Sequence, residues 1–426
     1  MRFAEALAEL NGRQPERMVP DLSRIAAMAE LLDDPQLTYP TIHITGTNGK
    51  TTTSRLITSL ACTHGLRVGT YTSPHLESVT ERISICSDPI SEEDFGEEYG
   101  HLLPYLLTVD GRSEEQVTYF ETLTALAYLW FADKPVSVGV FEVGMGGRWD
   151  ATNLVAGDVA VLCPIALDHP ELGSTVEEVA SEKADIIKPG KVAIVREQPE
   201  EAMRVIEGKA AAVGANLLLE GRDFEVADCK QAIGGQAIKI RGMRDTYEEL
   251  FVPMFGDHAA RNAAAAVAAT EAFLDRPLSV KAVRAGLRDA RSPGRLEVVA
   301  RRPLVILDGA HNPAGAQALA SALPEAFTWK RLILVAAMSA NKSLEGIVSA
   351  IAPLADDVIA TRNSSERSAE ATTAAEAFRA AGVEAAVSPD VASAIAGALH
   401  SAGEEDAVVI TGSLYTVADA RRALES

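Results

Sequence analysis

The segment Thr41–Thr53, TIHITGTNGKTTT, constrains the fold more than any other part of this 426-residue sequence. A β-branched strand runs into a glycine-rich turn, and a lysine, hydroxyl residues and a helical pattern follow. Gly46 and Gly49 let backbone N–H groups turn inward, and the helix N-terminus adds its dipole, so the segment predicts a cradle for nucleotide phosphates. Lys50 is predicted to reach the outer phosphates and Thr51 to ligate magnesium. The loop reads G-x-x-G-K-T and departs from the usual G-x-x-x-x-G-K-[ST], so a glycine turn beside an incidental lysine is the alternative.

Short β-branched runs alternate with amphipathic or alanine-rich stretches along the first part of the chain. This alternation is typical of a parallel sheet covered by helices. The runs are interpreted as buried strands at Thr41–Thr45, Val136–Glu142, Asp158–Cys163 and Val192–Val195. Between Phe224 and Val252 the apolar residues alternate singly, which predicts an antiparallel hairpin or meander.

The segment Arg291–Gly294, RSPG, interrupts a helical pattern and precedes a second series of strands. These are expected at Leu304–Leu307, Leu332–Ala336, Val358–Thr361, Glu384–Val387 and Ala407–Thr411, each before a helical pattern. We therefore predict an α/β protein in two domains. A P-loop parallel-sheet ATPase domain (residues 1–290) is joined by a linker (291–295) to a smaller Rossmann-like, doubly wound domain (296–426).

The charge of the chain limits its partners. Sixty acidic residues against 39 lysines and arginines give a formal net charge of −21, which would repel a phosphate backbone. Because no concentrated basic stripe is present, we expect no nucleic acid partner. The acidic start, MRFAEALAEL, is unlike a secretion signal, and no run of about 18 apolar residues occurs. These patterns predict a cytoplasmic protein that does not enter a membrane.

The four cysteines of the chain are scattered and show no C-x-x-C pairing. They stand at Cys62, Cys86, Cys163 and Cys229. This spacing argues against a zinc knuckle and a disulfide framework, and it predicts reduced, buried thiols.

Polar side chains follow two of the predicted strands. Glu142 ends an apolar strand before a glycine run, which places it at the sheet edge where open α/β folds bind ligands. One carboxylate beside the phosphate loop suits Mg²⁺, and the alternative is a strand-terminal glutamate that faces solvent. Asp168 and His169 follow the next strand and are placed near the same cleft. His169 is a candidate ligand of a second metal, although a lone loop histidine is more often structural.

The helical pattern TVEEVASEKADIIKPG places Lys183 on an apolar stripe. Burial would lower the pKa of this lysine and make its amine reactive, including towards CO₂ to form a carbamate. From the pattern alone, the favoured interpretation is a lysine that extends outward or pairs with Glu182 or Glu178.

Nine blocks, taken in order, carry a family resemblance: HITGTNGKTTT, TSPHLESVTERI, TYFETLTALAYLWF, VFEVGMGGRWDATN, IALDHPELGSTVEEVASEKADIIKPG, GDHAARNAAAA, PGRLEV, ILDGAHNPAGA and ITGSLYTV. The chain resembles the dihydrofolate synthase/folylpolyglutamate synthase family of Mur-like ligases. The resemblance covers nearly the whole chain, and the quoted blocks themselves run from residue 43 to residue 417. TSPHL, GGRWDATN and TGSLY are specific to this branch.

The resemblance implies an acyl-phosphate mechanism. ATP would phosphorylate the carboxylate of dihydropteroate or of the terminal glutamate of a folate, and the amine of an incoming L-glutamate would displace the phosphate. The products would be an amide, ADP and phosphate. The resemblance also implies ATP and two Mg²⁺ ions as cofactors, and a monomeric protein. The metals and Lys50 would supply the positive charge that an acidic protein otherwise lacks.

The resemblance assigns residues to this chemistry by position in the motifs. The triphosphate would be held by Thr47, Asn48, Gly49, Lys50, Thr51 and Thr52. Ser73 and Glu142 would ligate one magnesium, Glu142 and His169 would share the second, and Lys183 matches a carbamylated lysine. Many family members have glycine after the loop lysine, whereas this chain has Thr51 and Thr52. Either of these two hydroxyls would therefore ligate magnesium.

Further positions would contact the substrates. Asn262, Arg295 and Asp308 match residues that contact ATP, so the nucleotide would be clamped between the two domains. The pteroate moiety would lie near Phe120, Gly147, Arg148 and Asp150, and His311 and Ser413 are candidates for the glutamate side. The structural alternatives are a core aromatic for Phe120 and helix-capping turns for the DGAHNP and TGS segments.

Two other functions compete with this interpretation. A cell-wall Mur ligase shares the phosphate loop and joins amino acids to a UDP-linked sugar, but only about 45 residues precede the loop here, too few for a typical UDP-binding domain. A noncatalytic nucleotide-binding regulator or GTPase-type switch would not need Glu142, His169 and Lys183. No guanine-reading N-K-x-D motif occurs.

Overall fold

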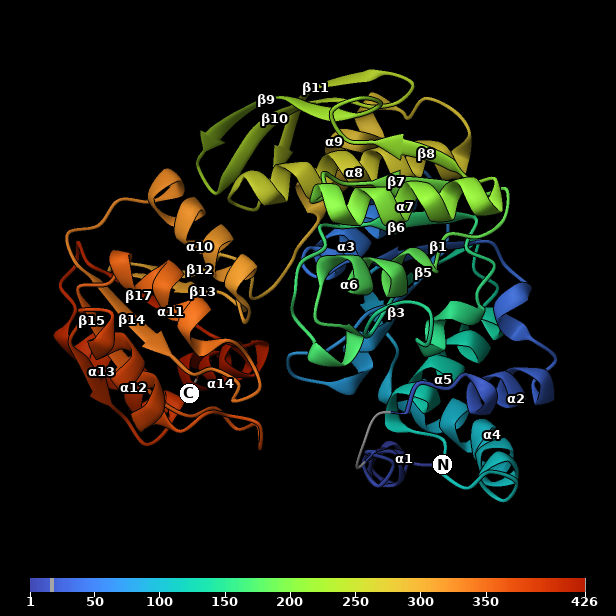
Figure 1. The fold of residues 1–426 in the computed structure, drawn as a ribbon, viewed down its shortest axis with the longest axis horizontal. Coiled ribbons are helices and arrows are strands. Elements are labelled where there is room, and N and C mark those ends of the chain that lie inside the picture. The colour runs from blue at the N-terminus through green and yellow to red at the C-terminus, as the bar shows by residue number, and fades with distance from the viewer. Residues whose placement is uncertain (16–18, 426) are drawn as a thin grey trace. The chain divides into compact units, whose positions relative to one another are not determined.

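A computed structural model describes residues 1–15 and 19–425, and the chain divides into two compact units (Figure 1). The first unit contains residues 1–228, 238–251 and 261–290. The second contains residues 229–237, 252–260 and 291–426. A small sheet contributes residues to both, with its strands in the order β11-β10-β9 (Glu225–Ala232, Gly235–Arg241 and Thr246–Val252 for β9, β10 and β11). Three successive strands that pair as neighbours agree with the predicted meander.

The first unit is built on an eight-stranded sheet in the order β4-β3-β2-β5-β1-β6-β7-β8. The six strands from β2 to β8 in this order are parallel, and β3 and β4 run antiparallel at one edge. The bounds are β1 Thr41–Thr45, β2 Val68–Tyr71, β3 Ile83–Ile85, β4 Asp88–Pro89, β5 Val138–Glu142, β6 Val159–Leu162, β7 Val192–Val195 and β8 Asn216–Leu219. Because β5 and β6 flank β1, the loops that leave these three strands meet at one edge of the sheet.

Helices cover this sheet, and two of them precede its first strand in the chain. Their bounds are α1 Phe3–Asn11, α2 Ser23–Leu31, α3 Lys50–Thr63, α4 Glu92–Asp110, α5 Tyr119–Asp133, α6 Val176–Ala184, α7 Glu200–Val213, α8 Asp257–Leu274 and α9 Val280–Asp289. Helices α5 and α6 begin at capping boxes, Thr118 with Glu121 and Thr175 with Glu178. Among residues 1–15 and 19–425, no helix is long and apolar enough to span a membrane.

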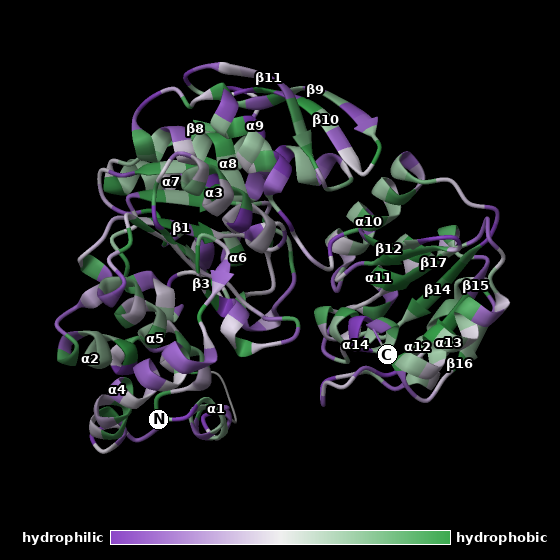
Figure 2. Cartoon of the chain, turned by 180° about the vertical axis from the view of Figure 1, so that it is seen from behind, coloured by the Kyte–Doolittle hydropathy of each residue, from purple (hydrophilic) through white to green (hydrophobic). Residues whose placement is uncertain are grey.

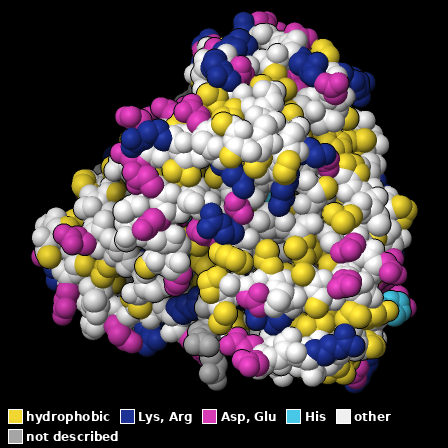
Figure 3. All heavy atoms as spheres, turned by 45° about the vertical axis from the view of Figure 1, so that its right-hand side comes forward, with side chains coloured by type: hydrophobic (Ala, Val, Ile, Leu, Met, Phe, Trp, Pro, Cys, Tyr) yellow, Lys and Arg dark blue, Asp and Glu magenta, His cyan; other side chains and the backbone are white. Residues whose placement is uncertain are grey.

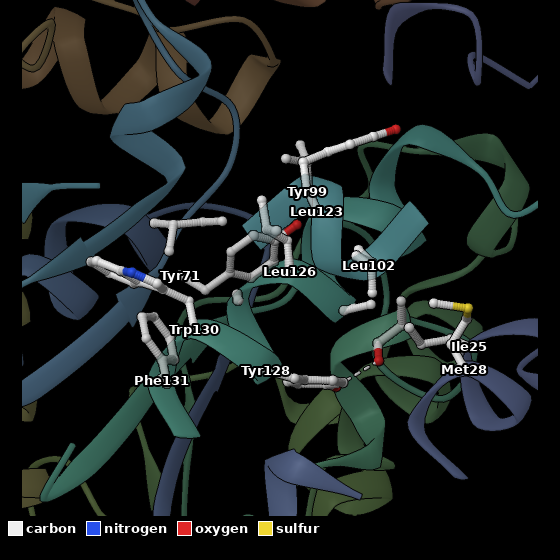
Figure 4. Packing of buried hydrophobic residues seen from close by; sticks show 14 of the residues in the cluster. Ile25, Met28, Tyr71, Tyr99, Leu102, Leu123, Leu126, Tyr128, Trp130 and Phe131 are labelled. Carbon is white, nitrogen blue, oxygen red and sulfur yellow. Dashed lines mark hydrogen bonds between the residues drawn. The ribbon is translucent and has the colours of Figure 1, made fainter. Parts of the chain in front are cut away.

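The main aromatic core of the first unit lies around α5. Tyr71, Tyr128, Trp130 and Phe131 are almost fully buried, and Figure 4 shows them with leucines of α4 and α5 and with Ile25 and Met28 of α2. Complete burial of one such side chain contributes roughly 1.5–3 kcal/mol. This core fixes α5, which carries Phe120, against the central strands.

The second unit has a six-stranded sheet in the order β12-β13-β17-β14-β15-β16. All its pairs are parallel except β12 with β13. The strands are β12 Glu297–Arg301, β13 Leu304–Leu307, β14 Leu332–Ala336, β15 Asp357–Ala360, β16 Ala385–Val387 and β17 Ala407–Thr411, and the helices are α10 Pro313–Ala326, α11 Leu344–Ile351, α12 Ala371–Ala380, α13 Val391–Ser401 and α14 Leu414–Glu425. Figure 2 shows the hydrophobic β14 and β17 among these helices. The architecture agrees with the predicted doubly wound α/β class.

One prediction about the cysteines is wrong. Cys62, near the end of α3, forms a disulfide with Cys86, in the turn between β3 and β4. Cys163 is a buried thiol, as predicted, whereas Cys229 is exposed. The spacing of Cys62 and Cys86 does not reveal the pair, because it is the packing of α3 beside β2 that brings the two cysteines together.

The disulfide predicts a dependence of stability on reduction. It closes a loop with a sequence separation of 24 residues. Loop-closure entropy for such a loop corresponds to about 3.5 kcal/mol. We expect reduction by dithiothreitol, or the double substitution Cys62→Ser/Cys86→Ser, to lower the free energy of unfolding by that amount in urea titrations. The single variant Cys229→Ser is the control, and equal stability of the oxidised and reduced proteins would contradict the prediction.

Candidate active site

The phosphate loop lies between β1 and α3, as the sequence predicts. Gly49 has a φ of +88° and precedes the first residue of α3, and Gly46 has a φ of +144°. A Cβ at Gly46 would lie 2.5 Å from the Cβ of Cys163, so the loop packs tightly against the end of β6. Lys50 donates hydrogen bonds from Nζ to the carbonyls of Gly46 (2.9 Å) and Thr47 (3.3 Å). The lysine ammonium is therefore held directly over the loop.

Two hydroxyl-bearing residues meet the carboxylate that ends β5. Glu142 is 1% exposed, and its Oε1 accepts a hydrogen bond from Thr51 Oγ1 at 2.8 Å. Its Oε2 accepts one from the backbone N–H of Ser73 at 3.3 Å. Burial raises the pKa of Glu142, and the charge of Lys50 opposes this rise. The alternative of a solvent-facing glutamate is therefore excluded, and the residues predicted to ligate one magnesium lie together.

Thr51, rather than Thr52, carries this contact. Thr52 is 7% exposed in the first turn of α3, next to Asn48 and Gly49 of the loop. Thr47 pins the loop to the segment after β6, because its Oγ1 donates to the carbonyl of Ala166 (2.8 Å). Oxygen donors of hydroxyl and carboxylate type are those that Mg²⁺ prefers, so this set fits magnesium. No cluster of three or more His, Cys, Asp or Glu side chains suited to a metal is found in the described part of the chain.

Lys183 of α6 reaches the phosphate loop. Its Nζ donates a hydrogen bond to the carbonyl of Gly46 at 2.9 Å, and the residue is 4% exposed. The interpretation from pattern alone, an outward or glutamate-paired lysine, is wrong: Glu182 pairs with Arg148 instead, at 3.2 Å. Burial, together with the charge of Lys50, lowers the pKa of Lys183 to about 7.

One pocket gathers the loop, both lysines and His169. It is lined by Gly46, Lys50, Gly144, Asp168, His169 and Lys183, among others. His169 Nε2 lies 3.4 Å from Asp168 Oδ2, and the His169 side chain is 34% exposed. The pocket therefore brings three nitrogen-bearing side chains to the start of α3, in a protein of strongly negative net charge. On the face shown in Figure 3, basic and acidic side chains are interspersed.

The glycine-rich segment after β5 is fixed from two sides. A Cβ at Gly147 would lie 2.6 Å from the carbonyl of Glu182, to which Arg148 also donates its backbone N–H (2.9 Å). A Cβ at Gly144 would lie 2.5 Å from the ring of Phe120. Phe120 is only half-buried at the rim of the aromatic core, so its ring borders this segment. The structure thus brings together the residues predicted to surround the pteroate moiety.

Asp150 is buried inside this segment and is used internally. Its Oδ2 accepts a hydrogen bond from the N–H of Met145 (2.9 Å), and its Oδ1 accepts from the N–H and hydroxyl of Thr152 (3.0 and 2.5 Å). Burial raises the pKa of Asp150. The carboxylate therefore orders the segment from Gly144 to Thr152.

Sequence reasoning missed His43 of β1, which completes this network. Its Nε2 lies 2.8 Å from Thr152 Oγ1, and the residue is fully buried. Because the Thr152 hydroxyl donates to Asp150, His43 donates to Thr152 through Nε2–H. Burial, aided by the charge of Lys188, lowers the pKa of His43 to about 3. A polar residue within an apolar strand was the available signal.

The buried His43 predicts a loss of stability in acid. Below about pH 6.5 the unfolded chain protonates this histidine, whereas the folded protein keeps it neutral down to about pH 3. The free energy of unfolding should therefore fall with pH across this window. We expect a loss of about 3 kcal/mol from His43 between pH 7 and about pH 4.5. His43→Gln, which keeps a donor and cannot titrate, should lose less in urea titrations at the two pH values, and an identical pH dependence in both proteins would refute the assignment.

Asn262 of α8 lies at the phosphate loop. Its carboxamide packs against Gly49, where an added Cβ would lie 2.9 Å from Asn262 Oδ1. The residue is 2% exposed, and its Oδ1 accepts a hydrogen bond from Arg196, which follows β7. Arg196 was not predicted, although a charged residue at the carboxyl end of a buried parallel strand was a usable signal.

The remaining predicted residues lie in the second unit, at the ends of two neighbouring strands. Asp308 follows β13 and accepts hydrogen bonds from the N–H groups of Leu296 (2.9 Å) and Ala310 (2.8 Å), and burial raises its pKa. Arg295 lies close by, since a Cβ at Gly309 would be 3.0 Å from its Nη1. Ring nitrogen Nδ1 of His311 lies 2.8 Å from the carbonyl of Gly309.

The capping alternatives for the tail motifs are also realised. Asn312 caps α10 by accepting the N–H of Gly315 at 2.8 Å. Ser413, 4% exposed, follows β17 and accepts the N–H of Tyr415 on Oγ at 3.1 Å. Since β13 and β17 are parallel neighbours, Asp308 and Ser413 stand at the same edge of this sheet.

Comparison with known proteins agrees with this arrangement. The model of the Mur ligase middle domain matches residues 44–270, and that of the Mur ligase glutamate ligase domain matches residues 294–414. A dihydrofolate synthase/folylpolyglutamate synthase of Mycobacterium tuberculosis is 39% identical, covering 97% of this chain and 92% of the relative. Its counterpart in Bacillus subtilis is 31% identical, with 99% of each chain covered.

Solved structures give the same result. Mycobacterium tuberculosis folylpolyglutamate synthase complexed with ADP superposes with a TM-score of 0.96 at 37% identity, covering 100% of this chain and 98% of that one. An FPGS–AMPPCP–folate complex superposes with a TM-score of 0.86 at 31% identity and covers both chains completely. The chain belongs to the dihydrofolate synthase/folylpolyglutamate synthase family of Mur ligases.

Proposed function

We propose that this protein is an ATP-dependent carbon–nitrogen ligase that adds L-glutamate to dihydropteroate, to the terminal glutamate of a folate, or to both. The observation that carries the proposal is the hydrogen bond from the buried Lys183 to the carbonyl of Gly46. A nucleotide switch needs no buried lysine in addition to Lys50 at its phosphate loop. The names of the relatives, which are folylpolyglutamate and dihydrofolate synthases rather than UDP-sugar ligases, support the folate substrate.

The reaction has two steps. The substrate carboxylate attacks the γ-phosphorus of ATP, and the bond between this phosphorus and the β,γ-bridging oxygen breaks. The products of this step are an acyl phosphate and ADP. The neutral amine of glutamate then attacks the acyl carbon, the carbon–oxygen bond to phosphate breaks, and the amine gives up a proton as the amide forms. Both steps bring anions together, so local positive charge lowers the barrier.

The residues of the first unit have separate roles in this proposal. Thr47 to Thr52 cradle the triphosphate with the N-terminus of α3, and Lys50 donates to the outer phosphate oxygens. Magnesium, which would neutralise phosphate charge when bound, would be held by Thr51, Ser73 and Glu142. His169 and Glu142 would hold a second ion, ordered by a carbamate on Lys183. Phe120 and the segment from Gly147 to Asp150 would border the pterin-linked substrate.

The second unit contributes the remaining assignments. Arg295 and Asp308 are proposed to contact ATP together with Asn262, and His311 and Ser413 to contact glutamate. The domain limits 1–290 and 296–426, the monomeric state and the cytoplasmic location stay predictions. So does the expectation that the protein binds neither nucleic acid nor membranes.

A coupled assay tests the function. Pure protein is incubated with MgATP, L-glutamate and either dihydropteroate or tetrahydrofolate, with products resolved by mass. Phosphate release that requires both glutamate and the pterin substrate, with a product heavier by one glutamyl residue, is the expected result. Release without cosubstrates, or none with either pterin, would reject the proposal. The side-by-side design also shows which of the two acceptors is used.

A further inference from the structure

Arg196 is a buried arginine next to the phosphate loop that the reaction scheme leaves without a role. It directly follows β7, its backbone N–H donates to the carbonyl of Leu162 (3.0 Å), and the residue is 3% exposed. Its Nε donates to Glu220 at 2.9 Å, at the end of β8. Arg261 of α8 donates to the other oxygen of Glu220 at 2.7 Å. One carboxylate therefore holds two arginines.

These two arginines stabilise the ionised form of the Glu220 carboxylate. Burial alone would raise the pKa of the Glu220 carboxyl, but the hydrogen bond from Arg261 and the charge of Arg196 outweigh it and lower the pKa. The guanidinium of Arg196 is thus fixed at one end by an ionised carboxylate. Its Nη1 makes a second hydrogen bond, to Asn262.

That second end of Arg196 sets the direction of the Asn262 carboxamide. Nη1 of Arg196 donates to Asn262 Oδ1. A guanidinium has only hydrogen-bond donors. It therefore favours the amide orientation in which the oxygen of Asn262 faces Arg196. Both polar atoms of the amide lie beside Gly49, where an added Cβ would be 2.9 Å from Oδ1 and 3.3 Å from Nδ2, so Nδ2 directs its N–H groups into the surroundings of the loop. Asn262 is 2% exposed, so neighbouring protein groups rather than water set the orientation of its amide.

We propose that Arg196 is a positioning residue for nucleotide binding: it locks the Asn262 carboxamide so that Nδ2 is presented as a hydrogen-bond donor at the phosphate loop. The inference rests on the proposed function, because Asn262 is assigned to ATP there. Without Arg196 the amide can turn over and present its oxygen, which repels an anionic or electron-rich acceptor. The loss should appear in nucleotide affinity rather than in the chemical step.

A purely structural role of Arg196 makes a different prediction. If Arg196 only joined β7, β8 and α8, its removal would disturb the loop regardless of the side chain at position 262. If it acts through Asn262, its removal has no further effect once the amide is gone. A double-mutant cycle separates these two cases.

The experiment measures the dissociation constant of ADP by titration calorimetry for the wild type, Arg196→Met, Asn262→Ala and the double variant. We expect each single variant to weaken binding about five- to twentyfold, in line with one lost hydrogen bond, and the double variant to be no weaker than the weaker single one. KM for ATP should rise in Arg196→Met with little change in kcat. Arg261→Met, which removes the other partner of Glu220, should stay within about twofold of the wild type.

Three outcomes would overturn the proposal. These are affinity within about twofold of the wild type in Arg196→Met, unchanged affinity in Asn262→Ala, and losses that multiply in the double variant. Melting temperatures check the fold, and if Arg196→Met does not fold, the cycle is run with Arg196→Lys, which keeps a charge for Glu220. Because ADP binding needs no turnover, a wild type that binds ADP without adding glutamate rejects the proposed function alone.

Discussion

Replacing Lys50 by alanine is expected to lower kcat/KM for ATP in glutamate addition about 10³-fold. Lys50 Nζ is held over the phosphate loop by the carbonyls of Gly46 and Thr47, where the outer phosphates of ATP are proposed to lie. A cation fixed beside developing phosphate charge stabilises the transition state more than the ground state, and removal of one such donor typically costs 10²–10³-fold. Since Lys50 is both a donor and a full charge, the upper end of that range is expected.

The measurement is steady-state phosphate release with saturating glutamate and pterin substrate. Lys191→Ala is the matched control, because Lys191 pairs with Asp158 at the opposite end of the strands and is 41% exposed. Full activity of a well-folded Lys50→Ala protein would remove the basis for the proposed phosphate chemistry.

Replacing Lys183 by alanine is expected to lower kcat about 10²–10³-fold, with a loss of metal dependence that Lys50→Ala does not share. Burial keeps the pKa of Lys183 at about 7, so the neutral amine predominates above that pH. A neutral amine adds CO₂ to form a carbamate and releases a proton, which would place a new carboxylate in the pocket. Activity should therefore rise with pH through about 7 and should fall when CO₂ is removed.

Chemical rescue provides the decisive measurement for Lys183. A small carboxylate such as acetate, added to Lys183→Ala, should restore part of kcat by standing in for the carbamate. Lys209→Ala is the control, because Lys209 pairs with Asp185 just beyond α6 and does not line the pocket. Wild-type activity that is indifferent to CO₂, combined with no rescue by carboxylates, would exclude the carbamate.

The strands of the two main sheets could be predicted where apolar runs are continuous. Strands β1, β7, β13, β14 and β17 begin and end at the predicted residues. Five strands were missed, and one of them, β2, is a buried interior strand of four residues. The others lie at or near the sheet edges and are short or exposed: β3 and β4 contain three and two residues, β8 has four, and β12 has Val299 41% exposed. Such edge strands carry too few buried residues for a periodic signal, because their pairing depends on the sheet beside them.

The sequence predicts site residues that stand at the ends of strands. It does not predict contacts between residues that are far apart in the chain. Glu142 was placed correctly because parallel strands send their carboxyl ends to one edge. By contrast, the partner of Lys183 is Gly46, 137 residues earlier, and no local pattern contains that contact. The same holds for Cys62 and Cys86, and for Arg196, whose partners come from β8 and α8.

The disulfide has a mechanical consequence for the segment that carries Ser73. Between Cys62 and Cys86 the chain passes through β2, the Ser73 segment and β3, so these elements form a covalent macrocycle anchored to α3. A swing of the whole hairpin about its base is blocked while the bond persists. Movement of Ser73 away from Glu142 then requires backbone rotations within residues 72–82. We therefore expect Ser73 to move a shorter distance from Glu142 in the oxidised protein than in the reduced protein.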